Sequence, residues 1–393
     1  MPLEPLSYHH EVVAALRREE PGLWEWFASD AVEEAFAERV RLDLLKSTVR
    51  LGRAQHGALH EAADAAKEAF DLDVEVSFYQ AAAGVDINAG LCHLPGEAHV
   101  VLSGPVLDKL DERELRALVG HELAHQKLLT LGDGEHRIAQ QLLRSIADHS
   151  GAASSYLFTA QRLEQMTEVV ADRGGCLIGG GVAPMVRCLA KTLSGLTTVD
   201  ADDYAAQAAD VMRRGAEAGE GTHPETFARV HLLVEGERDP ANADDLVQAV
   251  IRGPVRMDAL DLPAQLALVA TTRALVSVCL AEPLLATETV RVHAAGFFDG
   301  EAEDGGPVVL PEPLHESVAE YLAYVLLDLA TVDPDIGDLA LALVDRVASA
   351  HGLGAAFETV ARKELRRSKK AVAELRAKLP ALEERARTQA GAS

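Results

Sequence analysis

Two histidines four residues apart, with a glutamate directly after the first, constrain this chain more than any other feature of its sequence. The histidines are His121 and His125, and the glutamate is Glu122. In a helix of 3.6 residues per turn, the two imidazoles lie about 40° apart on the helix surface, so both can reach one metal ion. Glu122 lies roughly 100° around the helix from His121. The spacing therefore predicts a helix that carries two metal ligands and a carboxylate free to act on a water molecule at the metal.

The residues before this motif favour a helix. Acidic residues at Asp111, Glu112 and Glu114 open the segment, and apolar residues follow at helical spacing as far as Gly120. Acids in the first turn and apolar residues at this period are typical of the start of an amphipathic helix. A buried helix with two hydrogen-bonded histidines and no metal is the alternative interpretation.

A catalytic zinc site needs a third protein ligand and one open position. About forty residues downstream, Glu168 and Asp172 are again four residues apart, in a segment of helical character that we expect to end at Gly174-Gly175. One carboxylate can bind the metal, and the other can accept a hydrogen bond from a ligand histidine. The apolar residues 169–171 predict a largely buried helix, in which carboxylates need partners. A solvent-facing acidic helix is the alternative, because acids are plentiful at a net charge of −25.

Two further segments accompany the histidines and carboxylates. Residues 87–90 read Ile-Asn-Ala-Gly and precede a turn at Pro95-Gly96 and a strand-like segment over residues 98–103. Farther along the chain, residues 222–224 read Thr-His-Pro and are followed by Arg229. The four elements are the segment over residues 87–90, the histidine motif, the pair of carboxylates and the Thr-His-Pro segment with its arginine. In their order along the chain, they resemble the gluzincin metallopeptidases of the CAAX prenyl protease, HtpX and BepA type, which form family forty-eight of the metallopeptidases.

The resemblance covers roughly residues 56–237 and implies one zinc ion per chain in a zincin-like core. It implies that the zinc ligands are His121, His125 and Glu168, and that Glu122 is the general base. It also implies that Asp172 supports a ligand histidine. The function it implies is hydrolysis of peptide bonds by a zinc-activated water, in a protein that acts as an endopeptidase on a peptide or protein substrate.

The resemblance also implies a small antiparallel sheet beside the helix that carries the motif. Asn88, Ala89 and Gly90 would belong to its substrate-binding strand, and the segment over residues 98–103 would be its edge strand. An exposed edge strand presents unpaired N–H and C=O groups that can hold an extended peptide. A covered edge strand is the alternative.

The Thr-His-Pro element predicts a helix start beside the zinc. We expect Thr222 to cap a helix whose second residue is Pro224, so that the positive helix end disfavours protonation of His223. A neutral His223 can still donate a hydrogen bond to an oxyanion, which is the role that the resemblance implies. Arg229 could pair with Glu168 or Asp172, or help on the oxyanion side; a surface salt bridge is the alternative.

The sequence departs from the best-known relatives in its hydropathy. The longest apolar candidate, residues 266–285, is interrupted by Arg273 and Glu282, so we expect no transmembrane segment. The N-terminus lacks the pattern of a signal peptide. The four cysteines show no paired metal spacing and suit a reducing compartment. We therefore expect a soluble, cytoplasmic protein, and its acidity argues against nucleic-acid binding.

The remainder of the chain predicts helices, and the whole predicts a mostly helical α+β protein. We expect a helical N-terminal segment over residues 1–55, the metallopeptidase domain over residues 56–237 and a helical accessory domain over residues 238–393. The last helix, expected from Phe357 to about Leu379, contains the only dense basic run and is a possible partner contact. A degenerate peptidase fold that acts as a binding or adaptor module is the alternative function.

Overall fold

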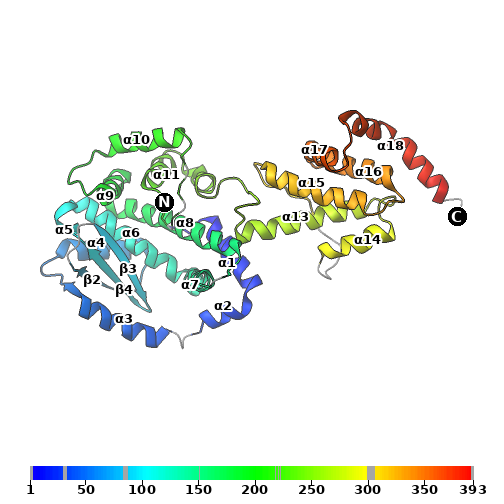
Figure 1. Cartoon of the computed structure of the whole chain (residues 1–393). Helices are drawn as coiled ribbons and strands as arrows, with labels where there is room; N and C mark the ends of the chain where they lie inside the picture. Colours follow the sequence, from blue (N-terminus) through cyan, green and yellow to red (C-terminus); the bar gives the residue numbers. More distant parts are fainter. Residues whose placement is uncertain are drawn as a thin grey trace. The chain divides into compact units, whose positions relative to one another are not determined.

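The chain forms two compact units, Met1–Gly253 and Pro254–Ser393. The computed structural model describes residues 3–29, 33–82, 87–149, 151–216, 218–219, 221, 223–298 and 306–390. The first unit combines one four-stranded sheet with helices, and in the second unit the described residues form helices and connecting loops (Figure 1). The predicted α+β, mostly helical fold class is confirmed.

The first unit contains twelve α-helices within its described residues. They are α1 (Ser7–Glu19), α2 (Pro21–Phe27), α3 (Glu33–Ser47), α4 (Gly57–Phe70), α5 (Val106–Lys109), α6 (Glu112–Thr130), α7 (Glu135–Ala147), α8 (Ser154–Gly179), α9 (Val182–Ser194), α10 (Ala201–Arg213), α11 (Thr226–Arg238) and α12 (Ala243–Val247). The motif helix is α6, which begins as predicted: Asp111 accepts from the backbone N–H of Glu114, and the Glu114 side chain accepts from that of Asp111.

The sheet is mixed, so the prediction of an antiparallel sheet is wrong for one strand pair. Its strands are β1 (Thr48–Leu51), β2 (Glu75–Ala81), β3 (Asn88–Leu94) and β4 (Glu97–Ser103), in the spatial order β1-β2-β4-β3. β3 and β4 form a hairpin through the expected turn at Pro95-Gly96, and β4 returns between β3 and β2, where it runs parallel to β2. The segment over residues 98–103 is therefore an inner strand, and β3 is the edge strand.

One hydrophobic core joins the sheet to the helices that carry the motifs. Ala98, Val100 and Leu102 of β4 are fully buried, since alternate residues of a strand point to the same face. They share a cluster with residues of α4, α6 and α8, among them Leu123 and Ala171. This core fixes α6 against the inner face of the sheet and α8 against α6.

Helix α8 continues through Gly174-Gly175, although we expected these residues to end it. Their role is close packing: a Cβ at Gly174 would lie 2.5 Å from the Cβ of Ala124, and one at Gly120 would lie 2.7 Å from the Cβ of Ile178. Glycine weakens a helix interior by only about 1 kcal/mol, so tertiary packing can keep such a helix intact. The missing side chains let α6 and α8 approach closely.

The second unit contains α13 (Leu262–Leu280), α14 (Glu288–Ala294), α15 (Glu316–Thr331), α16 (Gly337–Ala350), α17 (Gly354–Glu364) and α18 (Lys369–Ala390). These helices enclose their own hydrophobic core. Among the described residues, α13 is long and apolar enough to cross a membrane by length and composition, but half of the most apolar window is buried inside the protein. A half-buried apolar helix is also what the core of such a bundle contains.

The basic segment near the C-terminus, expected to form a single helix, forms two helices. α17 ends at Glu364, and α18 begins at Lys369; Arg366, whose φ of 52° is left-handed, lies in the turn between them. The basic run therefore spans a helix end, a turn and a helix start. Arg367 pairs with Asp338 at 2.8 Å, and Lys363 lies 3.6 Å from Glu320.

Candidate active site

Three side chains from α6 and α8 bring their ligand atoms together. The Nε2 atoms of His121 and His125 are 3.2 Å apart, and Glu168 places its carboxylate oxygens 3.6 Å from Nε2 of His121 and 3.4 Å from Nε2 of His125. A tetrahedral zinc ion, with bonds of about 2.0–2.1 Å to nitrogen and oxygen, separates its ligand atoms by about 3.3 Å. The three residues therefore fit zinc. Within the described residues, they are the one group of this kind that could hold a metal ion.

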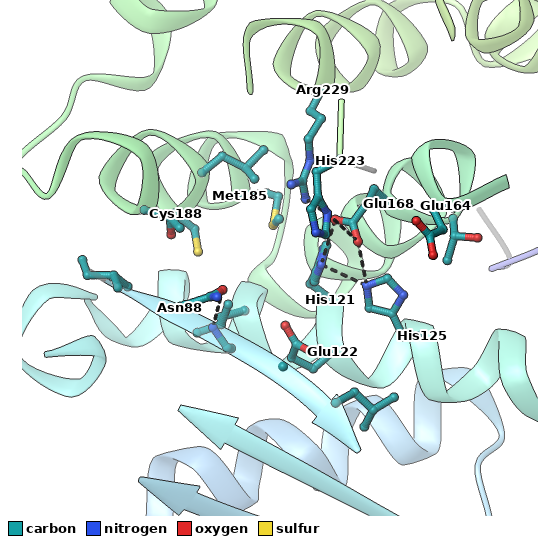
Figure 2. A pocket seen from close by; sticks show the side chains of 18 of the residues that line it. Asn88, His121, Glu122, His125, Glu164, Glu168, Met185, Cys188, His223 and Arg229 are labelled. Atoms are coloured by element: carbon teal, nitrogen blue, oxygen red, sulfur yellow. Dashed lines mark hydrogen bonds and ion pairs between the residues drawn. The ribbon is translucent and has the colours of Figure 1, made fainter. Parts of the chain in front are cut away.

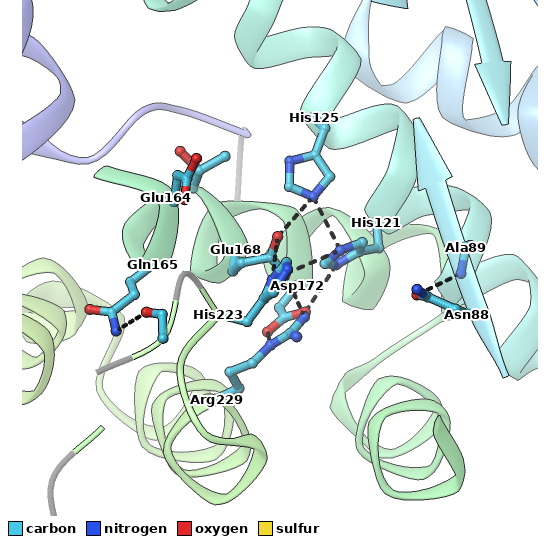
Figure 3. A network of polar contacts seen from close by, with 12 residues as sticks. Asn88, Ala89, His121, His125, Glu164, Gln165, Glu168, Asp172, His223 and Arg229 are labelled. Carbon is cyan, nitrogen blue, oxygen red and sulfur yellow. Dashed lines mark hydrogen bonds and ion pairs between the residues drawn. The ribbon is translucent and has the colours of Figure 1, made fainter. Parts of the chain in front are cut away.

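A buried ion network orients this ligand set (Figure 3). Asp172 lies one turn beyond Glu168 on α8, is fully buried, and places Oδ1 3.0 Å from Nδ1 of His121. Burial alone would raise the pKa of Asp172, but Arg229 and His121 lower it. The carboxylate is therefore ionised and accepts the proton of Nδ1, which leaves the lone pair of Nε2 directed at the metal position.

Arg229 of α11 contacts both carboxylates, as the sequence allowed. Its Nε and Nη2 donate to the two oxygens of Asp172 at 2.8 and 2.5 Å, and Nη2 lies 3.1 Å from Glu168. Its side chain is only 12% exposed, so this is a buried bidentate pair and not a surface salt bridge. The pKa of Glu168 lies well below its usual range, because hydrogen bonds with His125 and His223 outweigh its burial.

Glu122 lies beside the ligand set without joining it (Figure 2). It points from α6 into the space between His121 and β3, and it is 4% exposed. Burial raises the pKa of Glu122, although both histidines oppose the effect. A carboxylate whose pKa moves toward neutrality is a better proton acceptor at neutral pH.

His223 reaches the same site from the loop before α11. Its Nδ1 lies 3.2 Å from Oε1 of Glu168, while its side chain remains 67% exposed. The helix expected to begin near Pro224 begins at Thr226, and Thr222, its expected cap, lies outside the described residues. The hydrogen bond with Glu168 raises the pKa of His223 and outweighs its burial, which is the opposite direction to the one expected from a helix end.

The loop that carries His223 is held by Gln165, a residue that the sequence analysis missed. Gln165 lies on α8, three residues before Glu168, and is 2% exposed. Its Nε2 donates to the carbonyl oxygens of Gly219 and Gly221 at 2.9 and 2.8 Å. Because the partners are main-chain carbonyls, no pattern of residue types could have indicated this contact.

Edge strand β3 forms one wall of a cleft of about 670 Å³ above the ligand set. The predicted substrate-binding residues Asn88, Ala89 and Gly90 line this wall. A hydrogen bond of 2.9 Å between His93 on β3 and Gln126 on α6 ties the strand to the motif helix. The edge strand is therefore fixed relative to His121, His125 and Glu122.

The cleft has two further walls that the sequence analysis did not identify. One consists of residues of α9, and the other of residues of α7 and α8. The α9 wall contains Met185, Cys188, Leu189 and Thr192, and the opposite wall contains Gln140, Arg144, Glu164 and Thr167. None of these residues belongs to a spaced motif, so only the fold brings them to the site.

The model of peptidase family M48 matches residues 54–236, the segment that holds the ligand set, the edge strand and Arg229. This segment belongs to peptidase family M48. The predicted resemblance is thereby confirmed at the level of the family, and the M48 domain is a metallopeptidase domain. No curated protein and no solved structure matches the chain.

Proposed function

We propose that the M48 domain is a gluzincin endopeptidase that binds one Zn²⁺ per chain through His121, His125 and Glu168. The observation that carries the proposal is the spacing of the three ligand atoms, 3.2 to 3.6 Å, which suits tetrahedral zinc. The ligand set also opens into a cleft beside an edge strand, where an extended peptide can pair with the backbone of β3.

Each side chain at the site has a role in this proposal. When bound, zinc makes a water molecule acidic near neutral pH and polarises the peptide carbonyl. Glu122 takes the proton of the attacking water and delivers it to the leaving nitrogen. His223 donates a hydrogen bond to the developing oxyanion, and a protonated His223 does so more strongly than a neutral one. Asp172 and Arg229 keep His121 and Glu168 in position.

The test removes the proton acceptor without removing the metal ligands. We expect Glu122→Gln to retain one zinc per chain, measured by metal analysis, and to lose about 100-fold or more of the rate of peptide cleavage. Glu112→Gln, on the exposed first turn of the same helix, is the matched control and should leave cleavage unchanged. A wild-type protein that binds no zinc would refute the proposal. Zinc and peptide binding by the wild type without cleavage would favour the adaptor alternative.

We further propose a cytoplasmic setting and a peptide or protein substrate. The described cysteines Cys92, Cys176, Cys188 and Cys279 are all free, as suits a reducing compartment. The net charge of −25 repels nucleic acid, so we propose no nucleic-acid partner. The basic residues around the turn between α17 and α18 are a candidate contact for a protein partner.

A further inference from the structure

Gln126 directly follows the proposed zinc ligand His125 on α6, and its side chain contacts the edge strand β3. We propose that Gln126 is a positioning residue: through its hydrogen bond with His93, it holds β3 in the place where this strand pairs with a substrate peptide. This inference rests on the proposed peptidase function and concerns how the same site prepares its substrate-binding strand.

The contact lies just beyond the part of β3 that lines the cleft. Oε1 of Gln126 and Nδ1 of His93 are 2.9 Å apart. Residues 87–91 line the cleft, and His93 follows two residues later on the same strand. Because alternate residues of a strand share a face, His93 lies on the face of Ala89 and Leu91, which pack against the core that includes α6. The hydrogen bond therefore joins the inner face of β3 to the motif helix.

The side chain of Gln126 is fully buried, yet only one of its two amide atoms has a partner. Oε1 meets His93, whereas Nε2 has no hydrogen-bond partner within the described part of the chain. Turning the amide over would only exchange the two atoms, so one of them is unpaired in either orientation. A buried amide atom without a partner is unfavourable, and an apolar side chain of the same length would avoid that penalty. Stability alone therefore does not explain a glutamine at this position.

The strand β3 needs support because it lies at the edge of the sheet. β4 pairs with it on one side, and residues of its other side line the cleft. Two residues of the cleft portion, Asn88 and Gly90, are exposed. Asn88 uses its side chain locally, because Oδ1 accepts from the N–H of Ala89 at 2.9 Å, and Gly90 has no side chain to pack. These two residues therefore add little to the hold on the strand.

A strand that is already in place binds a peptide more tightly than one that must first be ordered. Pairing with a peptide fixes the backbone of β3, and fixing a mobile backbone costs free energy that binding must supply. The contact between Gln126 and His93 provides this order before the peptide arrives. It should therefore lower the KM for peptides and leave kcat nearly unchanged, because the strand is ordered with or without the contact once a peptide is bound.

The test replaces the amide by an apolar side chain of similar length in full-length, zinc-loaded Glu122→Gln protein. The probe is a fluorescein-labelled peptide chosen from a random library by its binding to this protein. Gln126→Met should bind the probe about tenfold more weakly in fluorescence anisotropy, and the amides of β3 should exchange with solvent about tenfold faster. Gln207→Met, at an exposed glutamine of α10 outside the cleft, is the matched control and should change neither.

Stability separates a positioning role from an ordinary packing role. Gln126→Met removes an unpaired buried atom, and the half-buried His93 can reach water, so the midpoint of urea denaturation should stay the same or rise. His93→Leu leaves Gln126 buried without its partner and should lower that midpoint. The double variant should bind the probe about as weakly as either single variant, as expected for two residues that act through one contact.

The outcomes separate this inference from the proposed function. Unchanged binding of the probe by Gln126→Met would overturn the inference, and so would a lower urea midpoint or a loss of zinc in metal analysis. With Glu122 restored, Gln126→Met should raise KM about tenfold and change kcat less than about twofold; a fall in kcat alone would also overturn the inference. Weaker probe binding by Gln126→Met, in a protein whose wild type cleaves no peptide, would support the inference and overturn the peptidase function.

Discussion

Replacing Gly174 by alanine tests whether the close contact of α6 and α8 sets the geometry of the ligand set. The new Cβ would lie 2.5 Å from the Cβ of Ala124, whereas carbon atoms in contact lie about 3.5–4.0 Å apart. The helices must therefore separate locally by about 1 Å. A change of this size would lengthen the 3.0 Å hydrogen bond between His121 and Asp172 beyond the range of a hydrogen bond.

The expected effects on stability and on zinc affinity differ in size. Overpacking costs about 1–3 kcal/mol, and alanine recovers about 1 kcal/mol through its helix propensity, so Gly174→Ala should lower the free energy of unfolding by about 0–2 kcal/mol. Zinc affinity should fall about 10–100-fold, because losing the hydrogen-bond partner of a ligand histidine has an effect of that order. Competition with a chromogenic chelator measures the affinity, and urea denaturation measures the stability.

Gly22→Ala is the matched control. Gly22 also lies within a helix, α2, but a Cβ there meets nothing within 4 Å. We expect an increase in stability of up to about 1 kcal/mol and no change in zinc affinity. If Gly174→Ala also kept its zinc affinity and gained stability, the idea that glycine packing positions the ligands would be refuted.

Three further predictions concern groups around the site. Gln165→Leu removes both hydrogen bonds to the loop of His223, so kcat/KM in a peptide-cleavage assay should fall about tenfold while chelator competition shows unchanged zinc affinity. Arg229→Lys keeps a positive charge but cannot hold Asp172 bidentately, so chelator competition should show zinc affinity reduced about tenfold. Burial lowers the pKa of His9 to about 3, with His136 and His10 adding to the effect. Below the ordinary histidine pKa of about 6.5, His9 is protonated in the unfolded chain but neutral in the folded chain. The free energy of unfolding therefore falls as the pH falls from about 6.5 toward 3, by up to about 1.4 kcal/mol per pH unit. Urea denaturation between about pH 7 and pH 5 should show a weaker pH dependence in His9→Gln than in the wild type.

The sequence predicted the parts of the site that depend on spacing within one helix. His121 and His125 converge because residues four apart share a helix face, and the same rule places Glu168 above Asp172. The rule left open which carboxylate meets the metal position. The structure places Glu168 next to the two Nε2 atoms and Asp172 behind His121, a difference that depends on how deeply α8 packs against α6.

Predictions that depended on contacts between distant segments were less successful. Nothing in residues 98–103 indicates whether they lie at the edge or inside the sheet, because an apolar strand with one buried face is compatible with both. The glycine pair at 174–175 has the composition of a helix end, but the α6 surface it packs against lies some fifty residues away in the sequence. Likewise, the helix before Arg229 begins later than its Thr-His-Pro element suggested.

The α9 wall shows why such features are difficult to read from a sequence. A metal ligand must be one of a few residue types, so its identity and spacing carry information. The wall of a pocket needs only volume and polarity, and many apolar residues supply these equally well. Met185 and Leu189 therefore look like ordinary core residues of an amphipathic helix until the fold places them in the same cleft as Asn88 and the proposed zinc ligands. Because specificity depends on residues of this kind, two chains with the same ligand set can hydrolyse different peptides.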